Sequence, residues 1–250
     1  MRHTAVVSPH LDDAVLSAWL VLNGVERARV ISCFAGFPPI GVSGLWDERT
    51  GSPSAHAAVA TRRAEDVLAL GLTGSHAIHL DLLDAQYRVG GPPVEELASL
   101  LWPHLKDAEE VWLPAGLGGH VDHIGARRAG LKVTGPAQRT YLYADLPYAG
   151  QPAWPADLTG SPRDVAVHGL VWALRRPVPA RTWQATLADI GDAVPGDPRV
   201  QRLTPDQSRK KWKAVSIYRS QLSSLKCGPR HLLRRRRLFA YEVYWLLGAR

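Results

Sequence analysis

Short apolar runs alternate along the chain with longer segments whose apolar residues recur at helical spacing. Five runs are short and rich in β-branched or aromatic residues, and they predict strands: Thr4–Val7, Ala28–Ala35, His76–Leu80, Val111–Leu113 and Arg139–Tyr143. Four segments between them predict helices: Ala14–Leu22, Ala55–Leu70, Val94–Leu105 and Ile124–Val133. This alternation indicates an α/β fold with a mostly parallel, Rossmann-like sheet and helices on both faces. The sequence contains no Gly-x-Gly-x-x-Gly, so no dinucleotide is expected.

The chain is expected to be a single domain with an elaborated C-terminal region. Residues 1–146 are the predicted catalytic core, 147–205 a Pro-rich insertion near the mouth of the site, and 206–250 a basic helical segment. The stretch from Gly36 to Ser54 is expected to be a loop rich in Gly and Pro. The insertion has strand-like pieces at Val165–Leu174 and a helical pattern at Trp183–Ile190, and Gln207–Leu225 predicts a C-terminal helix.

Composition and charge argue against a membrane-spanning protein, a disulfide scaffold and a thiolate zinc protein. The 46% hydrophobic content suits a globular core, and no apolar run reaches the roughly 18 residues that cross a bilayer. The first strand begins at Thr4, which leaves no room for a signal peptide, so a cytoplasmic protein is expected. Cys33 and Cys227 are too few for a disulfide framework or a thiolate zinc site. The net charge of +7 is concentrated in residues 201–250, so the predicted core is not basic.

Two polar clusters follow predicted strands. The sequence SPHLDD occupies residues 8–13, after the first strand, and GGHVDH occupies residues 118–123, after the fourth. At a strand-to-helix turn, His10 and Asp13 are three residues apart and can converge on one metal ion, whereas Asp12 projects elsewhere and can hold a proton. Together the clusters offer imidazole and carboxylate ligands plus a spare carboxylate and a spare imidazole. That set is typical of a metal-dependent hydrolase.

The motifs PHLDD and HVDH resemble the signatures of the zinc-dependent N-acetylglucosaminyl deacetylase family, the PIG-L/LmbE-like proteins. The resemblance covers residues 1 to about 150 well and the last predicted helix loosely. It implies His10, Asp13 and His123 as ligands of Zn²⁺, although the same donors also accept Fe²⁺ or another divalent ion. The implied activity is removal of an N-acetyl or other N-acyl group from an amino sugar or glycoside.

The same resemblance assigns the remaining residues of the two motifs. A metal-bound water is the implied nucleophile and Asp12 its general base. His120 is expected to stabilise the oxyanion or to protonate the leaving amine. Asp122 is expected to hydrogen-bond a histidine and fix its tautomer.

Candidate substrate-binding residues lie outside the motifs. Arg62 and Asp84 match family positions that hold sugar hydroxyls. A wall around the sugar or aglycone is expected from Trp46, Asp47 and Tyr148. One branch of the family has a Tyr two residues before HxDH, where this chain has Gly118. Tyr87 and Tyr143 are the candidates to supply a hydroxyl in its place.

Other readings of the sequence are left open. A member of the same family could hydrolyse a non-sugar amide or a thiol conjugate. A basic nucleic-acid-binding protein with a vestigial metal site is suggested by Arg234–Arg237 together with Arg209–Lys211. A non-enzymatic binding module is the third alternative, and each cluster alone could simply cap a helix or lie on a loop. The expected partner is a small-molecule amino sugar or glycoside, with no specific nucleic acid and no transmembrane segment; homo-oligomerisation is left open.

Overall fold

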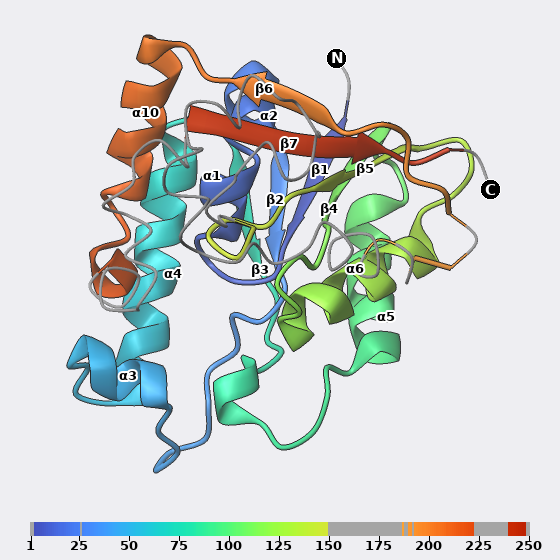
Figure 1. Ribbon diagram of the computed structural model, residues 1–250. Coiled ribbons are helices and arrows are strands. Elements are labelled where there is room, and N and C mark those ends of the chain that lie inside the picture. Colours follow the sequence, from blue (N-terminus) through green and yellow to red (C-terminus); the bar gives the residue numbers. More distant parts are fainter. Residues whose placement is uncertain are drawn as a thin grey trace, which may run out of the picture.

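A seven-stranded sheet runs through the centre of the structure, a computed structural model that describes residues 3–25, 27–149, 187, 190–191, 193–222 and 240–248 (Figure 1). Five strands are parallel: β1 Thr4–Ser8, β2 Arg29–Ser32, β3 His76–His79, β4 Glu110–Pro114 and β5 Arg139–Tyr143. At one edge β7 Tyr241–Leu246 runs antiparallel to β5, and β6 Arg199–Arg202 runs antiparallel to β7. The strand order is β3-β2-β1-β4-β5-β7-β6, so the predicted mostly parallel sheet is confirmed.

Helices cover both faces of this sheet. On one face, α10 Pro205–Val215 contacts both α1 Asp13–Ser17 and α4 Ala55–Gly71; on the other, α5 Val94–Leu105 packs against α6 Val121–Val133 (Figure 1). Shorter elements complete the described set: α2 Trp19–Gly24, α3 Leu45–Thr50 and the 3₁₀-helix η1 Ala85–Tyr87. All five residues of β1 are buried, as expected for a central strand that is covered on both faces.

Strands β1 and β4 are neighbours where the chain reverses its direction across the sheet. From β1 the chain moves outward through β2 to β3, then crosses back to β4 and continues to β5. The loops that leave β1 and β4 at their carboxyl ends therefore diverge, which opens a crevice in sheets of this type. Both polar motifs begin at that edge, so the topology brings them together.

The predicted helix Ala14–Leu22 is wrong as one continuous element. The chain breaks at Ala18, where φ is −126° and ψ is 29°, and forms α1 and α2. The Glu242 carboxylate on β7 accepts hydrogen bonds from the backbone N–H groups of Trp19 and Leu20, both at 2.9 Å, and from the Lys211 ammonium at 2.6 Å. This distant carboxylate satisfies the N-terminus of α2 and so stabilises the break.

Other elements also differ from the sequence predictions. The expected loop from Gly36 to Ser54 contains α3, and the predicted C-terminal helix stops at Val215, followed by a separate helical turn at residues 219–222. Segment 206–250, predicted to be helical, ends in strand β7. The strand-like Val165–Leu174, most of Trp183–Ile190 and Arg234–Arg237 lie outside the described residues. In the described part of the chain, no helix has both the length and the apolarity that a membrane span requires.

Candidate metal centre

The two motifs meet at the carboxyl ends of β1 and β4. Pro9 ends the pairing of β1, and the chain turns through His10 and Asp12 into α1. After β4 the chain turns through three glycines with positive φ before His120 caps α6: Gly116, Gly118 and Gly119. These left-handed turns suit glycine because it lacks a Cβ. They bring the start of α6 back over the end of β1.

His10, Asp13 and His123 place one ligand atom each at a common point. Asp13 Oδ2 lies 3.1 Å from His10 Nδ1 and 3.2 Å from His123 Nε2, and the three atoms lie within 4.8 Å of one another. Donors about 2.0–2.1 Å from a tetrahedral ion are separated by about 3.3 Å, so this spacing fits a divalent metal. Within the described part of the chain, His123 Nε2 is buried without a hydrogen-bond partner, because its approach to Asp13 is not aligned as a hydrogen bond. An orphaned imidazole nitrogen of this kind is what a metal ion would satisfy.

A carboxylate lies behind each of the two histidines. Asp122 Oδ2 is 3.1 Å from His10 Nε2, and Asp145 Oδ1 is 2.6 Å from His123 Nδ1. Asp122 is itself held by the backbone N–H of Ala85 and by the guanidinium of Arg88. Carboxylates in this position fix the tautomer and ring orientation of metal-binding histidines. Asp122 was expected to hydrogen-bond a histidine, and in the structure it lies within hydrogen-bonding distance of His10.

Asp145 is absent from the sequence predictions. It is fully buried and also accepts a hydrogen bond from the backbone N–H of Leu117 at 2.8 Å. Its only sequence signal is its position two residues beyond the end of β5, at the same edge of the sheet as both motifs. That signal becomes specific only once β5 is known to pair with β4.

The cluster is electrostatically suited to a cation. Burial disfavours charge on His10, but hydrogen bonds to Asp122 and Asp13 outweigh it and raise the pKa of His10 well above its usual value. Burial also opposes charge on His123, yet the carboxylates of Asp13 and Asp145 raise its pKa to about 9. For Asp13, burial is outweighed by both imidazoles, which hold the pKa of this carboxyl far below its usual range. Positive charge is therefore stabilised here, whether a proton or a metal ion supplies it.

Asp12 does not act as a helix cap. It occupies the N-cap position of α1, but its side chain makes no capping hydrogen bond. Burial, with the neighbouring Asp13 carboxylate, raises the pKa of Asp12 to about 7. A carboxylate with that pKa can take up and release a proton near neutral pH.

His120 faces the same cluster from the start of α6. Its ring centroid lies 5.0 Å from that of His10 and 5.3 Å from that of His123, and its Nδ1 accepts from the backbone N–H of Asp122 at 3.3 Å. Burial and the nearby His10 and His123 lower the pKa of His120 to about 4. The ring is therefore neutral at pH 7, and because Nδ1 accepts, its proton is on Nε2. His120 thus offers an N–H donor.

A small pocket adjoins His10 on the side of α4. Arg62 and Asp84 both line it, as do Phe34, Tyr87 and Gln221. The buried Arg62 donates to Asp47 Oδ1 at 3.0 Å, and Asp84 caps η1 by accepting from the backbone N–H of Gln86 at 3.0 Å. Trp46 lies half-buried on α3 and is not among the residues that line this pocket. Of the three predicted substrate-binding residues, Arg62 and Asp84 therefore share a pocket with the metal-cluster residue His10, and Trp46 does not line that pocket.

The tyrosine that approaches the cluster is Tyr148. The Tyr87 hydroxyl donates to the carboxylate of Asp47 and the Tyr143 hydroxyl to the carbonyl of Val7 at 2.8 Å, so both are otherwise engaged. The Tyr148 ring lies 5.0 Å from that of His123 and 5.5 Å from that of His120. A Cβ at Gly118 would lie 2.7 Å from the Cβ of Tyr148. Tyr148 therefore occupies the space that a side chain at Gly118 would need.

Comparison with known proteins finds similarity in structure rather than in sequence. No protein-family model and no curated protein match the chain. A triple mutant of a deacetylase of teicoplanin biosynthesis is 26% identical to this chain, with a TM-score of 0.75. The alignment covers 99% of this chain and 98% of that chain. The zinc-inhibited form of teicoplanin deacetylase Orf2 is 23% identical with the same TM-score and coverage.

Two further deacetylases share the fold. The A40926 pseudoaglycone deacetylase Dbv21 is 25% identical with a TM-score of 0.75, and the alignment covers 99% of this chain and 97% of that one. The N,N'-diacetylchitobiose deacetylase of Pyrococcus horikoshii, complexed with its inhibitor MPG, is 17% identical with a TM-score of 0.54, over 99% of this chain and 84% of that one. The sequence resemblance is clear only for residues 1 to about 150, whereas the structural similarity covers nearly the whole chain.

Proposed function

We propose that this chain, which belongs to the PIG-L/LmbE-like deacetylase family, removes the N-acetyl group from an amino sugar or its glycoside with the help of a divalent metal ion. His10, Asp13 and His123 would hold the ion. The observation that carries the proposal is the convergence of these three donors. Near them are the Asp12 carboxylate, which makes no helix-capping hydrogen bond, and the neutral imidazole of His120. Together they supply ligands, a base and a hydrogen-bond donor for amide hydrolysis.

The ion supplies two kinds of chemistry when bound: it lowers the pKa of a coordinated water from 15.7 to about 7, and it polarises the acyl carbonyl. The Asp12 carboxylate removes a proton as the water oxygen bonds to the acyl carbon. The Nε2–H of His120 donates to the carbonyl oxygen as negative charge develops there. When the C–N bond breaks, protonated Asp12 returns its proton to the amine nitrogen. The immediate products are the amino sugar and acetic acid, and transfer of the acid proton to the amine leaves an ammonium group and acetate.

Zinc is the proposed ion because two imidazoles and one carboxylate, with an open fourth position, form a typical catalytic zinc site. Fe²⁺ accepts the same donors, so the ion is best assigned by reconstitution. Teicoplanin deacetylase Orf2 has a zinc-inhibited form, which is a reason to add zinc in one equivalent rather than in excess.

The proposed substrate is a small molecule with sugar hydroxyls. Arg62 and Asp84 line the pocket next to His10 and would bind those hydroxyls, whereas Trp46 is not among the residues that line it. The basic residues Arg209 and Lys210 of α10 pair with Asp206, and Lys211 is buried against Glu242. Because Lys211 is buried and the exposed Arg209 and Lys210 share one carboxylate, this cluster gives less support to a nucleic-acid-binding surface than three free cations would.

The test is amine release by the full chain after chelation and after reloading with one equivalent of Zn²⁺, Fe²⁺, Co²⁺ or Mn²⁺. The substrates are methyl N-acetylglucosaminide, diacetylchitobiose and an N-acetylated glycopeptide pseudoaglycone, with a non-sugar acetamide and an N-acetylated thiol conjugate as comparisons. Turnover of a sugar substrate only after reloading is expected. Turnover of only the comparison amides would overturn the sugar assignment, and undiminished turnover after complete chelation would overturn the metal.

A further inference from the structure

The Gln221 side chain is a buried amide in the pocket beside His10. Gln221 is 6% exposed, and its Nε2 has no hydrogen-bond partner among the residues that the structure describes. The same pocket is lined by Arg62, Asp84 and Tyr87. A buried amide donor without a partner is unfavourable, and most such groups in folded proteins are paired. A ligand that supplies an acceptor would satisfy this donor.

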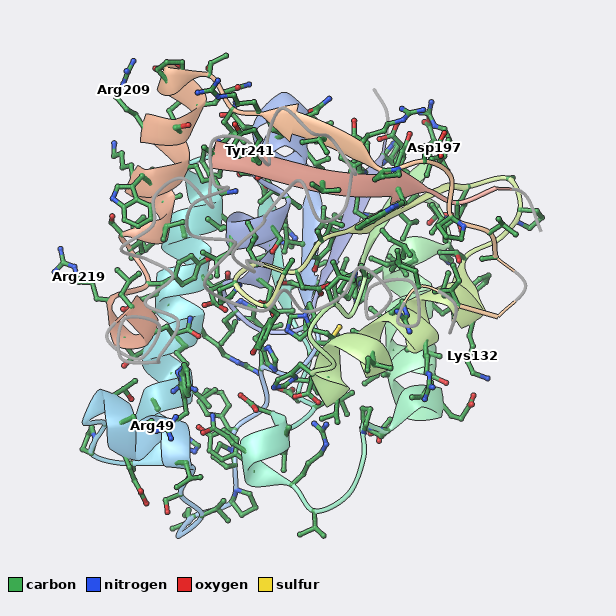
Figure 2. All side chains as sticks on the ribbon, viewed as in Figure 1. Arg49, Lys132, Asp197, Arg209, Arg219 and Tyr241 are labelled. Atoms are coloured by element: carbon green, nitrogen blue, oxygen red, sulfur yellow. The ribbon has the colours of Figure 1, made fainter. Side chains whose placement is uncertain are left out.

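Two neighbouring residues hold Gln221 in place. The Tyr218 hydroxyl donates to Asp66 Oδ1 at 2.7 Å, and Ser220 donates to Glu65 through both its backbone N–H and its hydroxyl, at 3.0 and 2.6 Å. These bonds fasten the helical turn at 219–222 to α4. The exposed Arg219, between the two anchors, points away from the fold (Figure 2).

The anchors on α4 also set the position of Gln221 relative to Arg62. Glu65 and Asp66 are three and four residues beyond Arg62, so all three lie on neighbouring parts of one helix face. Fastening the 219–222 turn to that face brings Gln221 to the same pocket as Arg62. The Arg62 Nε is also buried and unpartnered, although its Nη2 is bonded to Asp47. Two residues that line the pocket, Arg62 and Gln221, thus each carry a buried N–H donor with no partner among the described residues, and Asp84 contributes a carboxylate to the same lining.

This arrangement matches the chemistry of a hydroxyl group. A hydroxyl oxygen accepts hydrogen bonds from N–H donors, while its own proton is donated to a carboxylate. We propose that Gln221 is a substrate-binding residue whose Nε2–H donates to a ring hydroxyl of the amino sugar, next to the hydroxyl contacts of Arg62 and Asp84. The proposal rests on the sugar deacetylase function above and extends the substrate site to the C-terminal part of the chain.

The test compares Gln221→Met with wild type on methyl N-acetylglucosaminide and on its 3-deoxy, 4-deoxy and 6-deoxy analogues. Met has a similar length but no donor. Gln201→Met is the matched control, because Gln201 is exposed and its Nε2 donates to Tyr244, away from this pocket. Both variants are also compared with wild type in melting temperature.

The expected result is coupling between the residue and one hydroxyl. Wild type loses about 3- to 10-fold in kcat/KM on one deoxy analogue, and Gln221→Met loses a similar factor on the parent sugar but little more on that analogue. Because Met removes an unpaired buried donor, the melting temperature of Gln221→Met should not fall. Gln201→Met should behave as wild type.

Three results would overturn the proposal. Equal loss by Gln221→Met on all four sugars, with a lower melting temperature, would show a structural role only. No loss on any sugar would show that the amide does not contact substrate. If wild type turns over none of the four while still hydrolysing another amide, the sugar deacetylase function itself is wrong, and this proposal falls with it.

Discussion

Replacing Asp145 with Asn should weaken metal binding, although Asp145 does not touch the metal position itself. Its Oδ1 lies 2.6 Å from His123 Nδ1 and its Oδ2 accepts from the backbone N–H of Leu117 at 2.8 Å. Asn has the same shape but only one acceptor oxygen. If that oxygen stays on Leu117, the amide NH₂ faces His123 and requires Nδ1 to accept. The ring proton then moves to Nε2, the atom that faces Asp13 and the metal position.

The expected size follows from the bond that is lost. A hydrogen bond to a charged group contributes about 1.5–3 kcal/mol, and it is removed here from a fully buried pair. Since about 1.4 kcal/mol corresponds to a tenfold change, metal affinity should fall about 10- to 100-fold, the range typical of residues that orient a metal ligand. The assay is competition for Zn²⁺ against a chelator of known affinity, on wild type and Asp145→Asn.

Asp66→Asn provides a matched control for this experiment. Asp66 is 2% exposed and lies 2.8 Å from His79 Nε2, so it also pairs with a histidine, but the half-buried His79 is not part of the metal cluster. Its metal affinity should stay within about threefold of wild type. Equal affinities for wild type, Asp145→Asn and Asp66→Asn would refute the role of Asp145, whereas equal loss in both variants would show general destabilisation.

Three further perturbations have defined outcomes. His120→Ala should lower kcat about 10²- to 10³-fold with metal content unchanged, as measured by steady-state kinetics and metal analysis; loss of the metal would mean that His120 is a ligand. Lys211→Met leaves the buried Glu242 carboxylate without its cation and should reduce the free energy of unfolding by about 3–5 kcal/mol in a urea titration, whereas an unchanged midpoint would contradict the buried pair. Gly118→Ala adds a Cβ 2.7 Å from that of Tyr148 at a φ of +90°, so it should cost about 1–3 kcal/mol of stability and reduce kcat/KM; wild-type behaviour would show that the turn relaxes freely.

Much of the fold could be predicted because it depends on local pattern. The apolar runs mark β1 to β5, and the helical segments between them require crossovers that place the carboxyl ends of β1 and β4 together. For that reason His10, Asp13 and His123 could be assigned to one cluster although more than 100 residues separate the motifs.

The features that were missed depend on distant partners. Asp145 looks like any loop residue until β5 is placed beside β4, which brings it to His123. The break at Ala18 is stabilised by Glu242, from the other end of the chain. Strand β7 lies in the segment predicted to be helical, because it forms by pairing with β5 and β6, which the local pattern does not reveal. Gln221 is polar in sequence, and its burial follows only from the anchoring of its neighbours to α4.

In the proposed reaction Asp12 moves the proton, whereas other residues hold the metal. The most direct measurement is metal content and amine release for Asp12→Asn, reloaded with one equivalent of zinc beside wild type. Full metal occupancy is expected, with kcat reduced by at least about 10²-fold, because general acid–base catalysis by one positioned group typically contributes about 10²- to 10⁴-fold. Turnover within a few fold of wild type at full occupancy would show that Asp12 is not the general base.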